Sequence, residues 1–344
     1  MKFRLVVWLC ALLLPACSGD DRIKVVVYSP HGPDILNEFE RTFEARHPRA
    51  DVQTLNMPSG EILTRLRGEA ENPRSDVWWG APSSTFSRAA EEGLLEAYRP
   101  SWAEHVDPRY LDAENRFAGH FVIPQVILYN RDLLAPGDAP ADWDDLLDES
   151  FKGRIILRTP MPSGSMRGAF SWLVAWKSRG GHDLAAGFRF LEGLHRNTKK
   201  YAANPNEFFE AIKRDPDNAV GIWNLTDALF QREEKGYPFG VVIPESGVPI
   251  VIDCIALVRR PERDPARAEM ARAFYEFVTS LESARSLMNT HSRILTRLDI
   301  PREQLPERLR QYSFTPLEVD PSFAAQHEDE WMRRWDREIK PLPR

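Results

Sequence analysis

Short apolar segments rich in β-branched residues alternate with helical patterns along most of this chain of 344 residues. Residues 23–28 form such a segment, and a turn at 29–32 separates it from a helical stripe of apolar side chains at 35–43. The pattern recurs in the segments 51–61, 76–93, 153–176 and 219–227. Because parallel strands need crossover helices, the alternation predicts an α/β fold in which each sheet is mainly parallel and flanked by helices.

Two longer apolar segments, 121–130 and 250–258, interrupt this alternation. Each is predicted to be an extended crossover strand, so the chain leaves a first lobe, builds a second and returns. Two such strands form a hinge about which the lobes can close on a ligand, and the chain length also favours two cores. We expect lobe 1 at 18–125 with its return at 251–300, lobe 2 at 126–250, and at 301–344 a C-terminal helical tail that packs on the lobes.

The first 17 residues have the pattern of an export signal. A basic start precedes the apolar run 5–14, which is shorter than the ~20 residues that a membrane-spanning helix needs. The tetrapeptide Leu-Pro-Ala-Cys at 14–17 resembles, apart from its proline, the lipobox of bacterial lipoproteins. We expect 1–17 to be a lipoprotein signal peptide, Cys17 to be lipidated, and the protein to be periplasmic or extracytoplasmic and anchored to a bacterial membrane. Cleavage near Ala16 without lipidation is the alternative.

Charge and cysteine content exclude several classes of protein. The chain carries 45 Lys and Arg against 51 Asp and Glu, a net charge of −6 without a basic run, which argues against nucleic-acid binding. Of its three cysteines, Cys10 would leave with the signal and Cys17 would carry the lipid. Cys254 then remains alone in an apolar run and is expected to be buried. An exported chain with one thiol forms no internal disulfide, and no cysteine spacing indicates a metal site or a cofactor.

Five turns rich in serine, glycine and asparagine directly follow predicted strands. Ligands of open α/β sheets bind outside the carboxyl ends of the strands, where helix starts present unpaired N–H groups and partial positive charge. We expect the turns of both lobes to line one cleft. The predicted contacts are Ser29, His31, Gly32, Ser59, Gly60, Ala81, Ser83, Ser163, Gly164, Ser165, Asn224 and Thr226. For any single turn, capping of its own helix is the competing explanation.

Three charged residues beside these turns are further candidates. Arg167 follows the turn at 163–165 and could hold a phosphate or carboxylate through two parallel hydrogen bonds; a solvated surface arginine is the alternative. Asp227 and Asp253 could each hold an amine, although Asp227 would also favour the start of its own helix. His31 could donate to an anion or bind a metal.

The motifs of common hydrolases, nucleotide-binding proteins and dehydrogenases are absent from the sequence. It contains no H-E-x-x-H, G-x-x-x-x-G-K-[ST], G-x-S-x-G or G-x-G-x-x-G. No nucleophile and base stand at a recognisable spacing, so an exported hydrolase is disfavoured and the protein is predicted not to be an enzyme.

Several of these segments together carry a family resemblance. They are Val-Tyr-Ser-Pro-His-Gly at 27–32, Ser-Asp-Val-Trp-Trp-Gly-Ala-Pro at 75–82, 89–95, Trp-Asp-Asp-Leu-Leu at 143–147, Phe-Lys-Gly-Arg-Ile at 151–155, Pro-Ser-Gly-Ser at 162–165, 253–258 and 274–278. They resemble the type 2 periplasmic solute-binding proteins of ABC importers, within these the ferric-iron binders and their phosphorylated-solute relatives. The resemblance implies a two-lobed fold with a hinged cleft, a monomer, no catalysis, and a membrane permease with its ATPase as partners.

The resemblance also bears on the ligand. In the ferric binders a pair of tyrosines after the late strand binds iron, whereas here 223–227 reads Trp-Asn-Leu-Thr-Asp. Iron(III) prefers hard anionic oxygens, so we expect instead a small oxyanion-bearing solute such as a sugar phosphate or phosphonate, with Asp227 or Asp253 on an amine or hydroxyl. Ferric iron, with His31 as a ligand, is one alternative. A ligand-sensing partner of a membrane receptor kinase is another.

Overall fold

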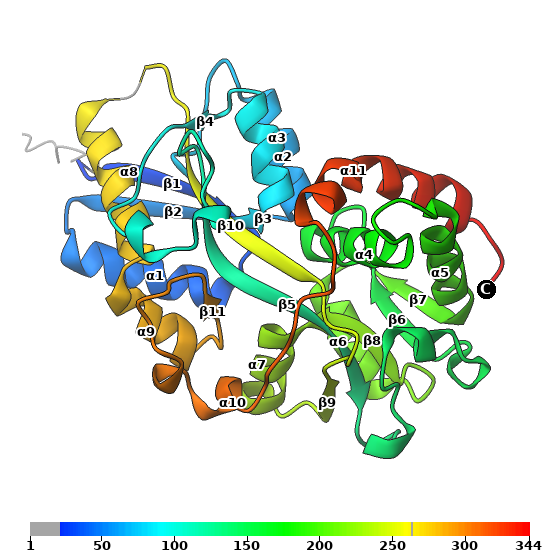
Figure 1. Cartoon of the computed structure of the whole chain (residues 1–344). Helices are drawn as coiled ribbons and strands as arrows, with labels where there is room; N and C mark the ends of the chain where they lie inside the picture. Colours follow the sequence, from blue (N-terminus) through cyan, green and yellow to red (C-terminus); the bar gives the residue numbers. More distant parts are fainter. Residues whose placement is uncertain (1–20, 263) are drawn as a thin grey trace, which may run out of the picture.

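The computed structural model describes residues 21–262 and 264–344 as two α/β lobes that share two long strands (Figure 1). The α/β fold and the two lobes predicted from the sequence are confirmed. The expected signal peptide and Cys17 lie outside the described residues. No helix within these residues combines the length and the apolar character needed to cross a bilayer.

Lobe 1 is built on three parallel strands with helices on both faces of its sheet. The strands are β1 (Ile23–Ser29), β2 (Ala50–Asn56) and β3 (Val77–Pro82). Helices α1 (Pro33–Arg46), α8 (Pro265–Val278) and α9 (Leu281–Asn289) cover one face, and α2 (Ser59–Gly68) and α3 (Ser83–Glu91) cover the other. Because both faces are covered, β1 can be apolar without strict alternation: Val25 and Val27 enter one core, Val26 and Tyr28 the other.

Lobe 2 repeats this arrangement. Its parallel strands are β6 (Ile155–Arg158), β7 (Thr198–Ala202) and β8 (Val220–Asn224). Helices α4 (Gly164–Lys177) and α5 (Leu184–Asn197) supply one core, α6 (Pro205–Arg214) the other, and α7 (Leu225–Lys235) contributes to both. Short 3₁₀ turns complete the connections at Ala103–His105, Pro108–Tyr110, Pro136–Asp138, Trp143–Leu147, Glu149–Phe151 and Arg302–Gln304.

The two lobes are joined by β5 (Ala118–Asn130) and β10 (Ile250–Val258), which pair with each other in antiparallel fashion. β5 pairs with β10 up to Pro124, and from Gln125 onward it pairs with β8 and with β9 (Phe239–Val242). All of these pairs are antiparallel, so each sheet is parallel only away from the crossover strands. Two short strands, β4 (Leu95–Glu96) and β11 (Ile294–Leu295), pair with β10 and β5.

The C-terminal segment returns to lobe 2. After α10 (Glu307–Arg310), helix α11 (Pro321–Arg334) packs on α4 and continues into one π-helical turn, Trp335–Ile339. Trp331 and Trp335 are fully buried in the core that α4 and α5 supply. Cys254 is buried on β10, as its apolar surroundings in the sequence indicated.

Substitution of Trp335 tests how much the packing of the C-terminal segment stabilises lobe 2. Its indole lies 5.8 Å from the ring of Phe170 and 5.2 Å from that of Tyr201, and its Nε1 has no hydrogen-bond partner. Trp335→Ala should therefore lower the free energy of unfolding by about 3–5 kcal/mol in urea titrations. Trp335→Phe should cost less, since it removes no hydrogen bond. A cost below about 1 kcal/mol for Trp335→Ala would mean that the segment is only loosely attached.

Candidate ligand-binding site

A buried histidine and a buried carboxylate lie at the floor of the junction between the lobes. His31 follows β1 and is 7% exposed, and Asp253 on β10 is 5% exposed. The distance from His31 Nε2 to Asp253 Oδ2 is 3.6 Å, which is too long for a hydrogen bond, and this Nε2 has no hydrogen-bond partner. The ring lies edge-on to Trp79, with 5.0 Å between centroids. A Cβ at Gly80 would come within 2.7 Å of Nε2, so only glycine fits there.

The strand itself is irregular at this carboxylate. The register of β10 shifts between Asp253 and Cys254 against β5, and between Asp253 and Ile255 against β3. Such bulges re-aim side chains and occur beside functional sites. Asp253 also accepts a hydrogen bond from the backbone N–H of Ala81.

Burial sets the protonation states of these two groups. Burial, together with the positive charge of Arg293, lowers the pKa of His31 well below its usual value, so the imidazole is neutral at physiological pH. Burial raises the pKa of Asp253 to about 7, although the charge of Arg293 and the Ala81 N–H oppose this rise. The junction therefore holds a neutral histidine beside a carboxyl group that titrates near neutral pH.

Arg293 links the two lobes at this junction. It lies between α9 and β11 of lobe 1, and its Nη1 donates to Asp227 Oδ1 at 2.8 Å and to Thr226 Oγ1 at 3.3 Å, both in the first turn of α7 in lobe 2. Its Nε is buried without a partner. The sequence analysis missed Arg293, because the only local signal is a basic residue just before a two-residue strand.

The five predicted turns differ in whether helix capping explains them. In lobe 2 it does: Ser163 Oγ accepts the Met166 N–H at 3.4 Å, and Asn224 Oδ1 accepts the Asp227 N–H at 2.8 Å. In lobe 1 it does not, since α1, α2 and α3 follow Gly32, Pro58 and Pro82 and receive no side-chain cap. Three helix starts of lobe 1 thus keep N–H groups without a side-chain acceptor.

The start of α4 in lobe 2 touches lobe 1 directly. A Cβ at Gly164 would lie 2.6 Å from Pro82 Cδ and 3.1 Å from Ser59 Oγ, so this contact requires glycine. Beside it, the site of a Cβ at Gly60 lies 3.8 Å from the carbonyl oxygen of Met161. With Arg293 on Asp227, these contacts define a closed arrangement of the lobes.

The structure brings most of the predicted contacts to this junction. Those from lobe 1 are Ser29, His31, Gly32, Ser59, Gly60, Ala81 and Asp253, and those from lobe 2 are Gly164, Asn224, Thr226 and Asp227. The hydroxyl oxygen of Ser29 accepts the backbone N–H of His31 at 3.1 Å. Ser163 serves as the α4 cap, and Ser165 lies half-buried in the first turn of that helix. Ser83 lies elsewhere, in a cavity on the side of α11.

Arg167 is not placed as the anion clamp expected from the sequence. Its Nε donates to Glu328 at 3.1 Å and its Nη2 to Asp329, both on α11. Arg88 of α3 pairs with the same two carboxylates. The charge of Arg167 is thus balanced by α11, a long-range contact that no local pattern in the sequence reveals.

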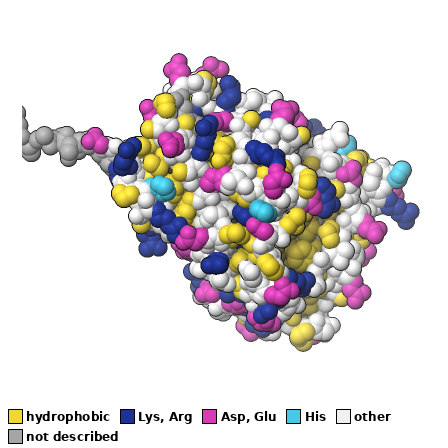
Figure 2. Space-filling model, turned by 60° about the vertical axis from the view of Figure 1, so that its left-hand side comes forward, with side chains coloured by type: hydrophobic (Ala, Val, Ile, Leu, Met, Phe, Trp, Pro, Cys, Tyr) yellow, Lys and Arg dark blue, Asp and Glu magenta, His cyan; other side chains and the backbone are white. Residues whose placement is uncertain are grey.

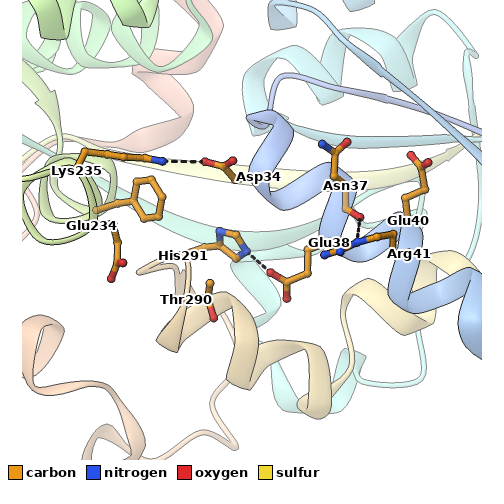
Figure 3. A pocket seen from close by; sticks show the side chains of 10 residues that line it. Asp34, Asn37, Glu38, Glu40, Arg41, Glu234, Lys235, Thr290 and His291 are labelled. Atoms are coloured by element: carbon orange, nitrogen blue, oxygen red, sulfur yellow. Dashed lines mark hydrogen bonds and ion pairs between the residues drawn. The ribbon is translucent and has the colours of Figure 1, made fainter.

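Two cavities flank the junction. One of about 730 Å³ opens between α1 and α7, where His291 contacts Glu38 at 2.8 Å and Lys235 lies 3.8 Å from Asp34 across the lobes (Figure 3). Acidic side chains outnumber basic ones in its lining, so it does not favour an anion. The other, of about 1060 Å³, lies between α3, α4, β10 and α11 and includes Ser83 and Arg88.

Charge and metal-binding potential constrain the site further. Figure 2 shows acidic and basic side chains interspersed over the face that it presents, without one basic patch there. Among residues 21–262 and 264–344, no group of three or more His, Cys, Asp or Glu is arranged to hold a metal ion. In the place where the ferric-iron hypothesis would require tyrosines, Thr226 and Asp227 instead contact Arg293.

Comparison with known proteins gives one family. A model described as a bacterial extracellular solute-binding protein matches residues 81–295. The chain is 26% identical over 245 residues to a protein of Sinorhizobium fredii provisionally named an ABC transporter periplasmic-binding protein, covering 71% of this chain and 67% of that one. It is 35% identical over 155 residues to a protein of Salmonella typhimurium provisionally named a 2-aminoethylphosphonate-binding periplasmic protein, covering 45% and 43%.

The fold has a close structural counterpart. The periplasmic binding protein AfuA of Actinobacillus pleuropneumoniae, solved with fructose 6-phosphate, superposes with a TM-score of 0.78 at 22% identity, covering 93% of this chain and 99% of that one. At this identity the likeness shows the fold alone.

The raised pKa of Asp253 gives a pH-dependent prediction. Its carboxyl group titrates near 3.8 when unfolded and at about 7 when folded, so it destabilises the folded protein progressively as pH rises from about 4 to 7. Asp253→Asn removes this effect, so the variant's gain in free energy of unfolding over the wild type should be larger at pH 8 than at pH 5, by about 2–3 kcal/mol.

Urea unfolding of both proteins at pH 5 and 8 measures this difference. Asp34→Asn is the control, because Asp34 is largely exposed on α1. An equal effect of Asp253→Asn at the two pH values would show that the carboxyl group is not held in a buried, poorly solvated place.

Proposed function

Because the chain belongs to the bacterial extracellular solute-binding proteins, we propose that it captures a small oxyanion-bearing organic solute between its lobes. As a solute-binding protein of an ABC transporter it works outside the cytoplasm and delivers its solute to the permease and ATPase components. The proposal rests on one observation: buried polar atoms without partners gather where the lobes meet, above all His31 Nε2 and Arg293 Nε. Buried polar atoms of this kind are unfavourable unless a ligand or water satisfies them.

The chemistry of the junction supports an anion. Arg293 contributes a charged donor, and the uncapped starts of α1, α2 and α3 contribute N–H groups and partial positive charge. Asp253 can pair with an ammonium or hydroxyl group on the same solute. The names of two of the proteins compared above fit this pattern, since fructose 6-phosphate and 2-aminoethylphosphonate both carry a phosphorus oxyanion beside a hydroxyl or amine.

We propose domain closure as the mechanism. The polar contacts that join the lobes in this arrangement include Arg293 with Asp227, Lys235 with Asp34, and Arg88 and Ser84 with α11. A solute that touches both lobes stabilises this arrangement over the open one, and the permease can then recognise the loaded protein by its shape. Lipidation of Cys17, which lies outside the described residues, and a monomeric state complete the proposal.

Arg293 is the first residue to test. Arg293→Gln removes the charged donor and the ion pair with Asp227, so affinity for fructose 6-phosphate or 2-aminoethylphosphonate should fall by roughly 10- to 100-fold, or about 1.5–3 kcal/mol. Isothermal titration calorimetry measures this change. Arg67→Gln is the matched control, since Arg67 pairs with Glu92 on the surface of lobe 1. Unchanged affinity in Arg293→Gln, where the wild type binds, would remove Arg293 from the site.

The contact between Arg88 and α11 tests the closure mechanism without a ligand. Arg88 lies on α3 of lobe 1, whereas Glu328 and Asp329 lie on α11, which packs on lobe 2. Arg88→Gln should weaken this link and increase the radius of gyration of the ligand-free protein in small-angle X-ray scattering. Arg99→Gln, which removes an exposed ion pair with Glu104 within lobe 1, should leave it unchanged. Identical scattering from wild type and Arg88→Gln would show that α11 does not bias the arrangement of the lobes.

A further inference from the structure

Arg158 is the only arginine or lysine that is buried among the described residues. It is the last residue of β6 and is 5% exposed. Its Nη1 donates to the carbonyl oxygen of Ala202 at 3.0 Å. That carbonyl oxygen also accepts hydrogen bonds from Thr159, through the backbone N–H at 3.0 Å and the hydroxyl at 3.1 Å, so it does not depend on Arg158.

No carboxylate balances this buried charge within the part of the chain that the structure describes. Glu207 is the acidic residue whose charge acts on Arg158, yet no ion pair joins the two. The carboxylate of Glu207 is occupied by Lys200 Nζ at 2.6 Å and by the Ala203 N–H at 2.5 Å. Burial accordingly lowers the pKa of Arg158. A buried cation without a counter-charge is unfavourable unless a binding partner supplies one.

Other well-shielded arginines at or near the junction are balanced. Arg167 is paired with Glu328, Arg293 with Asp227, and Arg297 with Asp299 at 2.7 Å. Each keeps its carboxylate in the closed arrangement of the lobes. Arg158 differs from all three, which excludes the explanation that a general shortage of acidic residues leaves arginines unpaired here.

The position of Arg158 places it at the edge of lobe 2 that faces lobe 1. β6 and β8 are adjacent and parallel, with Ile156 opposite Gly221. Continuing this register by two residues sets Arg158 beside Trp223, whose indole Nε1 is also buried without a partner. The chain then runs from Arg158 to Met161 and Gly164, two places where lobe 2 comes close to lobe 1.

We propose that Arg158 and the indole N–H of Trp223 form an anion subsite in lobe 2 that takes the oxyanion of the solute. The planar guanidinium suits the two oxygens of a phosphate monoester, a phosphonate or a carboxylate. This inference rests on the proposed function. With Arg293 on lobe 1, it places a cationic side chain on each side of the junction, so that an anion bound between them favours closure.

Arg158→Met tests the subsite, because methionine keeps an unbranched chain and removes the charge. Thermal unfolding and titration calorimetry would use inorganic phosphate, fructose 6-phosphate and 2-aminoethylphosphonate as probes. The variant should lose the rise in Tm that these anions give the wild type and bind them at least tenfold more weakly. Its ligand-free Tm should be unchanged or higher, because a buried unpaired charge has been removed. Arg196→Met, at an exposed arginine of α5 in the same lobe, should behave as the wild type.

The possible results separate the two proposals. A lower ligand-free Tm with an intact response to the anions would show that Arg158 only supports the fold, and would overturn the subsite alone. A full response and unchanged affinity in Arg158→Met would do the same. If the wild type responds to none of the three anions, both the oxyanion function and the subsite are wrong.

Discussion

The antiparallel pairing of β5 with β10 is the constraint on which the arrangement of the whole molecule depends. β5 belongs to both sheets and changes partners between Pro124 and Gln125. A strand shared in this way cannot slip in one sheet without disturbing the other, because a shift of one residue would turn every side chain to the opposite face. The carboxyl ends of the parallel strands of both lobes therefore meet at one junction. Small backbone rotations in the two crossover strands can open and close it.

The junction owes its chemistry to what burial does to charge. Asp253 lies on a crossover strand at a bulge, where burial raises the pKa of its carboxyl group more than the charge of Arg293 lowers it. Arg158, at the end of β6 in lobe 2, is buried without an ion pair among the described residues. A buried carboxyl group on a crossover strand and a buried guanidinium in lobe 2 are thus both left without an ion pair, an arrangement that is unfavourable for each. A solute with an oxyanion and an amine or hydroxyl group would satisfy both.

Much of the fold could be predicted from the sequence because it depends on local patterns. The β-branched run at 23–28 and the helical stripe at 35–43 are set by neighbouring residues, and the two crossover strands stand out by their length and apolar character. The direction of those strands was not predicted in full, because antiparallel pairing at the hinge follows from the chain path between lobes and not from composition.

The site was harder to predict, because its charges are assigned by distant contacts. Arg167 lies beside a predicted turn, yet its guanidinium pairs with Glu328 of α11, which is 161 residues further along the chain. Arg293 stands beside no recognisable turn, yet the pairing of β11 with β5 carries it to the junction. Glycine- and serine-rich turns in the sequence therefore help to predict where backbone N–H donors lie, but not which charged side chains reach the site.

The contacts that close the lobes have a strength suited to a binding cycle. Lys235 and Asp34 are both about half exposed or more, and exposed ion pairs of this kind stabilise little. The contact of Arg88 with Glu328 is better shielded, because Glu328 is 3% exposed, but the carboxylate of Glu328 also pairs with Arg167. If these contacts held the ligand-free protein closed more tightly, the solute could not enter. A solute shifts the equilibrium between the open and the closed form only by its difference in affinity for the two forms. On the proposed function, the unpaired charges of Arg158 and Asp253 would oppose closure until a solute is present, so that closure responds to binding.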